Sequence, residues 1–179
     1  EKYKQAIKVF DKIQTKHLSR TTEPMLYFYW GYALLELKEY ENALPLFLQL
    51  EKKHTLYTTH AKYYAGYCYY CMQDFPHALA KFMEVENLGS YKQIAPYYIT
   101  QIQYAQHQYD QVYERAEKLL VDYPDNQHND ELHRMLGEIY YQDSAYNDAI
   151  RHLETYYTLQ VEKQKEPMRN DIYLLGMAN

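Results

Sequence analysis

The chain has 179 residues, of which 47% are hydrophobic and 24% are charged, and its formal net charge is −5 at pH 7. A chain of this length and composition can bury a core of its own without disulfides or metals. The acidic balance and the lack of a lysine- and arginine-rich cluster argue against nucleic-acid binding. No run of eighteen apolar residues predicts a membrane-spanning helix.

Tyrosine is the unusual component of the chain, with 24 copies against five phenylalanines and one tryptophan. Because tyrosine joins a large apolar ring to a polar hydroxyl, a fold rich in it can bury aromatic area while the hydroxyls stay in water. Glycine (5) and proline (6) are scarce. This scarcity favours long helices joined by short turns.

Apolar residues at helical spacing predict helices along the whole chain. The expected helices cover about residues 2–17, 24–37, 40–54, 58–72, 75–88, 92–106, 109–122, 128–142 and 146–162, with a last start near 167. They group into a half-hairpin at 1–17, full hairpins at 24–54, 58–88, 92–122 and 128–162, and a truncated half-hairpin at 167–179. Because both end segments are half of a hairpin, we expect the sequence to be a piece of a longer protein.

Small residues recur along the chain at a nearly fixed interval, in steps of 35, 34 and 37 residues, at Ala43, Ala78, Val112 and Ala149. Three glycines, each twelve residues before an alanine of this series, keep the same interval: Gly31, Gly66 and Gly137. A small residue at a fixed interval marks a place where one helix approaches another closely. The pattern therefore predicts a stack of helical hairpins.

The residues around these positions resemble the tetratricopeptide repeat, whose pattern is W-x2-L-G-x2-Y, then A-x3-F, then P. The hairpin at 24–54 carries the fullest match, with Tyr27, Trp30, Gly31, Leu34, Tyr40, Ala43 and Phe47. The match weakens at 92–122, where Thr100 replaces the glycine and Val112 the alanine. The resemblance spans essentially the whole chain. It implies an all-α fold, a right-handed α-α superhelix of about ten helices that forms a single array over residues 1–179.

A narrower resemblance concerns the fourth hairpin. The segment Leu119-Leu120-Val121-Asp122-Tyr123-Pro124 before it is similar to the helix ends of the BamD/YbgF-like subgroup of bacterial envelope proteins. This resemblance implies a scaffold within a larger bacterial protein. It favours the cell envelope (periplasm) as location, with the cytoplasm as the alternative.

The first helix of each hairpin has two stripes at helical spacing. The stripe that contains the glycine is expected to pack against the partner helix. The second stripe lies about 115° round the helix, and in tetratricopeptide stacks it lines the concave groove. Its residues are Phe28, Tyr32, Leu35, Tyr63, Tyr67, Tyr70, Tyr97, Gln101, Tyr104, Arg134, Glu138 and Tyr141.

Seven of these twelve residues are tyrosines, which is the composition of a peptide-binding surface. Packing alone would predict arbitrary polar residues there. Tight curvature that buries the rings against neighbouring repeats is an equally good reading, and both stay open at this point. With Leu35 set aside, the remaining eleven residues are the predicted partner-binding site.

Other chemistry finds little support in the sequence. Cys68 and Cys71 form a C-x-x-C inside a predicted helix, with no strand before it and no second ligand pair for zinc. We read them as structural thiols and expect no metal and no cofactor. The eight histidines are scattered, and no P-loop or catalytic triad order is present. We therefore expect no catalytic residues and no enzyme activity.

These observations favour a non-catalytic scaffold that mediates protein–protein interaction through a tyrosine-rich concave groove. The partner is a protein or peptide of unknown identity. Three alternatives remain: a module that contacts carbohydrate through its aromatic rings, a module that self-associates through uncapped ends, and a redox or metal role for Cys68 and Cys71.

Overall fold

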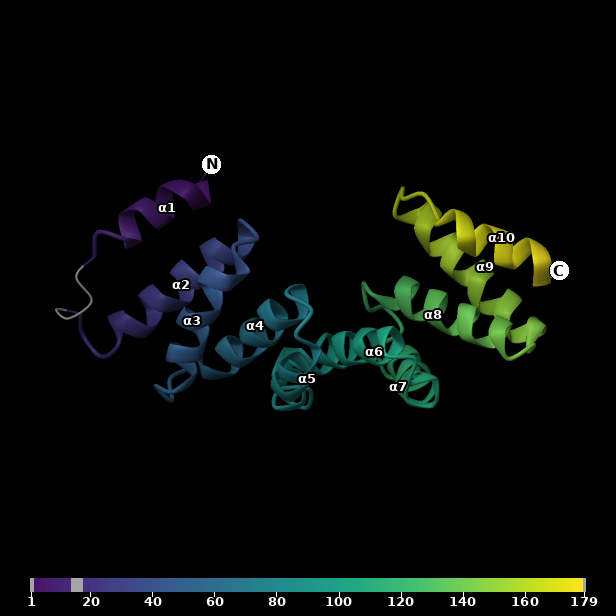
Figure 1. Ribbon diagram of the computed structural model, residues 1–179, viewed down its shortest axis with the longest axis horizontal. Helices are drawn as coiled ribbons and strands as arrows, with labels where there is room; N and C mark the ends of the chain where they lie inside the picture. Colours follow the sequence, from purple (N-terminus) through teal and green to yellow (C-terminus); the bar gives the residue numbers. More distant parts are fainter. Residues whose placement is uncertain (1, 14–17, 179) are drawn as a thin grey trace. The chain divides into compact units, whose positions relative to one another are not determined.

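The computed structural model describes residues 2–13 and 18–178, and within these ranges the chain forms ten α-helices, one short 3-10 helix and no β-strand (Figure 1). The all-α class expected from the sequence is confirmed. The helices are α1 (Lys2–Phe10), α2 (Thr22–Glu36), α3 (Tyr40–Glu51), α4 (Thr58–Cys71), α5 (Phe75–Met83), α6 (Ala95–Ala105), α7 (Tyr109–Asp122), α8 (Asn129–Gln142), α9 (Tyr146–Glu162) and α10 (Arg169–Ala178), with the 3-10 helix η2 at Gly89–Gln93.

Two expected helices differ in extent from those observed. The first, expected over 2–17, ends at Phe10, and residues 14–17 lie outside the described residues. The helix expected over 75–88 ends at Met83. Beyond it the backbone is extended at Leu88 and turns at Gly89, whose φ of +49° lies in the left-handed region that glycine adopts without strain. Helix η2 then leads to α6.

One turn geometry recurs between the two helices of each hairpin. In the first, Lys38 N–H donates to Leu35 O at 2.9 Å and Glu39 N–H donates to Leu34 O at 3.0 Å, which is the Schellman arrangement. The residue at the centre has φ between 58° and 62°, and it is exposed in all four turns: Lys38, Gln73, His107 and Ser144. These turns end α2, α4, α6 and α8. The same turn structure therefore recurs at the interval at which the small residues recur in the sequence.

The chain divides into two compact units, Glu1–Ala95 and Pro96–Asn179, which we call unit 1 and unit 2. In unit 1, each helix from α1 to α4 packs on the next one along the chain. Its core is built from α2, α3 and α4 and consists of Leu34, Ala43, Phe47, Leu50, Ala61, Ala65 and Cys68.

Unit 2 has a core of its own, built from α6, α7 and α8. Its buried residues are Tyr97, Val112, Ala116, Leu119, Leu132, Met135, Leu136 and Ile139. Helix α8 packs on both α7 and α9, and α10 contacts α8 as well as α9.

The three repeating glycines lie where a helix meets the second helix of its hairpin. A Cβ on Gly31 would lie 2.9 Å from the ring of Phe47, and one on Gly137 would lie 2.7 Å from Cγ of Leu153. A Cβ on Gly66 would lie 3.0 Å from Cβ of Lys81 and 3.2 Å from the ring of Phe82. We call Gly31, Gly66 and Gly137 the interlocking glycines. Each accommodates a large apolar side chain sixteen residues later in the sequence.

The third hairpin has different residues at the two equivalent positions. Thr100 takes the place of the glycine, and it is fully buried with its hydroxyl donating to Pro96 O at 2.9 Å. Ala116, sixteen residues later, is also fully buried. In this hairpin a larger residue, Thr100, stands at the glycine position, and a smaller one, Ala116, stands at the position of the large apolar residue. Both changes weaken the agreement of this hairpin with the repeat pattern.

Within the described ranges, no helix has the length and apolar character needed to cross a membrane.

Candidate partner-binding surface

The second stripe of the sequence divides evenly between the two units, and each half is described by itself. Unit 1 holds its α2 and α4 members, and unit 2 holds its α6 and α8 members. Most of these side chains are half-buried. Partial burial of this kind is expected for a side chain that packs against a neighbouring helix and still contacts solvent.

On α2 of unit 1, Phe28 and Tyr32 belong to an aromatic cluster centred on Tyr64. Phe28 stacks on Tyr57 with 4.9 Å between ring centroids, and its ring lies 6.0 Å from that of Tyr64. Tyr32 meets Tyr64 edge-on at 5.7 Å. The nearby carboxylate of Glu36 and partial burial raise the pKa of Tyr32 to about 12, so its hydroxyl stays protonated and can donate.

Tyr63 on α4 has a different role. It is buried, stacks on Tyr91 of η2 at 4.6 Å and lies 5.9 Å from the ring of Phe82. The hydroxyl of Tyr91 lies 2.5 Å from Nδ1 of His60. Tyr63 therefore packs inside the aromatic cluster around Tyr64 and is not exposed to a partner.

Tyr67 and Tyr70 continue the stripe along α4. Tyr67 meets Tyr40 edge-on at 6.4 Å, and its ring centroid lies 6.4 Å from that of Tyr70. Tyr70 in turn lies 6.3 Å from Phe75 at the start of α5. Both tyrosines are half-buried. Their rings are thus held by neighbours on α3 and α5.

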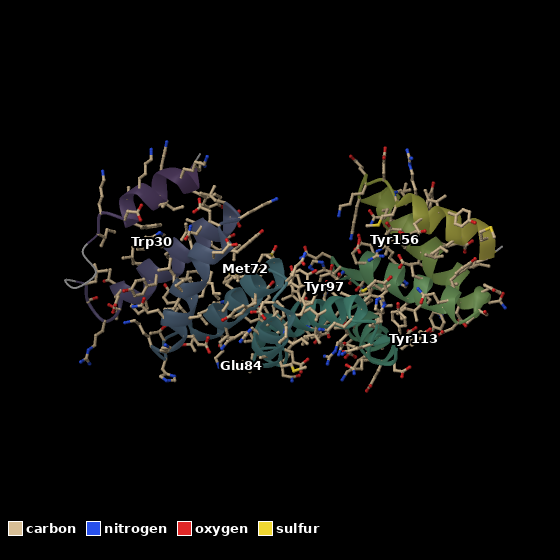
Figure 2. The ribbon with its side chains drawn as sticks, in the orientation of Figure 1. Trp30, Met72, Glu84, Tyr97, Tyr113 and Tyr156 are labelled. Carbon is tan, nitrogen blue, oxygen red and sulfur yellow. The ribbon has the colours of Figure 1, made fainter. Side chains whose placement is uncertain are left out.

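In unit 2, Tyr97 on α6 is buried and stacks almost parallel on His128, with 4.0 Å between ring centroids. Gln101 donates to the Tyr97 hydroxyl at 2.8 Å. Figure 2 marks Tyr97 among the side chains of this region. Beside it lies an open depression of about 540 Å³, lined by Tyr97, Gln127, His128, Asp130, Glu131, Lys163 and Lys165.

The remaining stripe residues of α6 and α8 form a polar cluster. Arg134 donates to Glu138 at 2.5 Å and to Glu131 at 3.0 Å, and its guanidinium lies 5.7 Å from the centre of the Tyr104 ring. The Tyr104 hydroxyl donates to Glu138. Burial, followed by the Glu138 carboxylate, raises the pKa of Tyr104 well above its ordinary value.

Asp171 of α10 borders this polar cluster and was not anticipated from the sequence. It is 2% exposed, and neither of its carboxyl oxygens is paired with a donor among the described residues. Burial first, and then the neighbouring carboxylate of Glu138, raise the pKa of Asp171 to about 7. Two carboxyl groups and one guanidinium therefore share a largely water-excluded place.

Tyr141 is the last stripe residue on α8. It is half-buried and meets Tyr146 of α9 edge-on, with 5.6 Å between the ring centroids.

The structure thus places the stripe residues of each unit in several small groups of contacting side chains, with unequal exposure. Tyr63 and Tyr97 are buried packing residues, and the other predicted site residues are half-buried. Sequence reasoning missed Tyr64, Tyr91 and Asp171. Tyr64 belongs to neither stripe in the helical projection. Tyr91 comes from a 3-10 turn that has no repeat counterpart, and Asp171 looks like an ordinary first-turn carboxylate.

Of the two cysteines, Cys68 has the character of a packed thiol, while Cys71 is half-buried. Cys68 is fully buried, and burial raises the pKa of its thiol to about 12. A reactive thiol requires a lowered pKa and solvent access. No three or more His, Cys, Asp or Glu side chains in the part of the chain that the structure describes are placed to hold a metal ion.

No protein-family model matches the chain, and a search of curated proteins returned no match. The function is therefore inferred from the residues and their geometry alone.

Proposed function

We propose that the chain is a tetratricopeptide-like solenoid that acts as a non-catalytic scaffold and binds a protein or peptide segment through its half-buried stripe residues. Support for the repeat comes from two features that share one interval. Each interlocking glycine lies against a large side chain that is sixteen residues further along the chain. The Schellman turns recur at steps of 35, 34 and 37 residues, the same steps as the small residues of the sequence pattern.

The observation that carries the binding role is the partial exposure of rings that are already fixed by their neighbours. Tyr32, Tyr67 and Tyr70 are each half-buried, and each has another aromatic ring beside it. Binding loses affinity when side chains must be ordered, and pre-ordered aromatic rings avoid most of that loss. Partly exposed tyrosine rings are common anchors of peptide recognition.

In unit 2, the polar cluster around Arg134 adds a charge preference to the stripe residues of that unit. Glu138 and Glu131 outnumber Arg134, so the cluster favours a donor group on the partner, such as a lysine side chain or a backbone N–H. The preferred ligand in this proposal is an extended or helical segment that combines apolar side chains with a few hydrogen-bond donors.

The test selects peptides from a displayed library with the chain as bait and measures their dissociation constants by fluorescence anisotropy. Tyr67→Ala is expected to weaken binding about tenfold or more, the loss typical of a central aromatic anchor. Tyr104→Phe removes only the hydroxyl and should weaken binding by a smaller factor. Tyr157→Ala, at an exposed tyrosine of α9 outside the stripe, is the matched control and should leave binding unchanged.

Circular dichroism of each variant separates lost binding from lost folding. If Tyr67→Ala unfolds the protein, the ring is a core element and the proposal fails for unit 1. Saturable binding on a glycan array, without binding of any peptide, would instead favour the carbohydrate-contacting alternative.

A further inference from the structure

One position of the repeat is filled by a buried apolar residue in four helices and by a carboxyl in α10. The position lies five residues before the glycine of a hairpin's first helix, or before Thr100 in the third hairpin. In α10 it is Asp171, five residues before Gly176, and it is 2% exposed. A carboxyl group is costly at a place where its neighbours bury apolar groups. The occupants in α2, α4, α6 and α8 are at most 6% exposed: Leu26, Ala61, Ala95 and Leu132.

The same carboxyl is central to how α10 is held in unit 2. Helix α10 packs on α9 and α8 (Figure 1), and Asp171 is the one fully buried residue among Arg169–Ala178. Neither of its carboxyl oxygens has a hydrogen-bond donor among the described residues. A helix that buries little apolar surface opens more easily than the rest of its unit. The docking of α10 therefore depends strongly on the state of this one group.

The groups that surround Asp171 do not neutralise it. The guanidinium of Arg134 already donates to Glu131 at 3.0 Å and to Glu138 at 2.5 Å. On α10 itself, Arg169 is exposed. The titratable and charged groups of the helices packed around this place are Tyr104 of α6, Glu131, Arg134 and Glu138 of α8, and Tyr156 of α9.

A proton removes the excess of negative charge. Glu138 lies close enough to Asp171 for a hydrogen bond between the two side chains. Two carboxyl groups can form such a bond only when one of them is protonated. Burial, followed by the carboxylate of Glu138, raises the pKa of Asp171 to about 7. In an open α10 the same carboxyl would ionise near its ordinary pKa of 3.8.

We propose that α10 takes up a proton when it docks on α8 and α9, that Asp171 and Glu138 hold this proton between them, and that α10 opens more readily as the pH rises toward neutrality. The docked helix keeps a proton that the open helix releases, so each pH unit between about 4 and 7 favours the open form about tenfold. Above about pH 7 neither form holds the proton, and the equilibrium is level.

Opening of α10 changes the surroundings of Arg134 and Glu138, which belong to the predicted partner-binding residues. A partner that contacts Glu138 would meet it with or without Asp171 beside it, depending on the pH. This consequence rests on the proposed function. The opening equilibrium does not, because it is a property of the chain without any partner.

The experiment is hydrogen exchange of the full chain without a partner, followed by mass spectrometry between about pH 5 and 8. Division by the intrinsic exchange rate at each pH gives the opening constant of each helix. For Arg169–Ala178 this constant is expected to rise about a hundredfold from about pH 5 to 7 and to be level above that. Helices α8 and α9 should not share the rise, because their opening also exposes His133 and His152, whose titrations act in the opposite sense.

Three variants identify the group that holds the proton. Asp171→Asn has no proton to release, so the opening constant of α10 should be independent of pH. Glu138→Gln removes the neighbouring carboxylate, which lowers the pKa of Asp171, so the rise should be smaller and should end at a lower pH. Glu154→Gln makes the same carboxyl-to-amide change at an exposed residue of α9 and should behave like the wild type.

Three results would overturn the proposal. The first is a wild-type opening constant of α10 that is the same at pH 5 and pH 7. The second is a rise that persists unchanged in Asp171→Asn and in Glu138→Gln. The third is opening of α8, α9 and α10 together with one pH dependence, because α10 would then not open by itself. Circular dichroism checks the folding of each variant, and if Asp171→Asn does not fold, the result for Glu138→Gln decides.

Discussion

At the scale of single residues, unit 2 contains buried ionisable groups whose titrations oppose each other. Burial lowers the pKa of His133 and of His152 to about 4, and their Nδ1 atoms lie 2.9 Å apart, so one ring donates and the other accepts with both neutral. Asp171 is shifted the other way, to a pKa of about 7. The free energy of unfolding therefore depends on pH through groups that are absent from the unit 1 core.

The sign of each effect follows from which state binds more protons. Folded unit 2 holds a proton on Asp171 that the unfolded chain releases above its ordinary pKa of 3.8, so this contribution is full below pH 3.8, declines between pH 3.8 and 7 and is gone above about pH 7. The unfolded histidines bind protons below 6.5 while the folded ones do not, so stability falls as pH drops from 6.5 to 4. Between pH 4 and 6.5 the two histidines change the free energy of unfolding more than the single carboxyl does, so the net stability falls as pH drops.

We therefore predict that the stability of unit 2 rises from pH 5 to about 6.5, falls slightly up to about pH 7.5 and is level above that. Asp171→Asn keeps the shape without the charge. It should remove the fall above pH 6.5 and raise the stability of unit 2 at pH 8 by on the order of 1–3 kcal/mol. The measurement is urea unfolding between pH 5 and 8.5. His152→Gln is the converse variant and should reduce the acid decline only. A wild-type stability that keeps rising up to pH 8.5 would contradict the assignment.

At the scale of elements, the hairpins depend on how closely two helices approach. The α8–α9 contact is the tightest, because a Cβ on Gly137 would lie 2.7 Å from Cγ and 2.8 Å from Cδ2 of Leu153, and 3.3 Å from its backbone nitrogen. A branched side chain beside a helical backbone has little room to move aside. Substitution at this position must push the helices apart.

We predict that Gly137→Ala destabilises unit 2 by about 1–3 kcal/mol, because overpacking outweighs the helix propensity gained. Gly176→Ala is the matched control. It makes the same chemical change at a position where the added Cβ has no neighbouring atom within 4 Å. It should therefore stabilise α10 by about 0.5–1 kcal/mol. Thermal unfolding at low protein concentration compares the two. Equal effects of both substitutions would show that close approach plays no part.

The sequence predicted the helices well because their apolar spacing is strong and local. The four Schellman turns fall where the helix pattern breaks, although none of them has the glycine that usually marks such a turn. The candidate surface was harder to predict. Helical geometry assigns a face but not an exposure, and the burial of Tyr63 depends on Tyr91, which a turn 28 residues away brings against it. Asp171 could not be predicted because its burial depends on how α10 meets α8.

At the scale of the whole molecule, the chain consists of two units with separate cores. The core of unit 1 centres on Phe47 and Leu50, and that of unit 2 on Leu136 and Ile139. In a repeat protein each element is stabilised mainly by its neighbours, so a defect is felt locally.

We predict that Phe47→Ala lowers the stability of unit 1 by about 3–5 kcal/mol, the cost of removing a large buried side chain. Unit 2 should change by less than about 0.5 kcal/mol, because Phe47 belongs to the core of unit 1 and not to that of unit 2. Hydrogen exchange measured by mass spectrometry reports both units in one experiment. Protection should be lost in α2 to α4 and retained in α8 and α9. Loss of protection across the whole chain would show that the units fold as one.

The left-handed turns have a consequence for how this chain can vary. Main-chain hydrogen bonds close each of these turns, and the side chain at its centre, for instance Lys38 or Gln73, projects into solvent. Substitution there alters solubility and surface charge without disturbing a helix contact. The hairpin tips are thus the natural attachment points for a fluorescent label or an affinity handle.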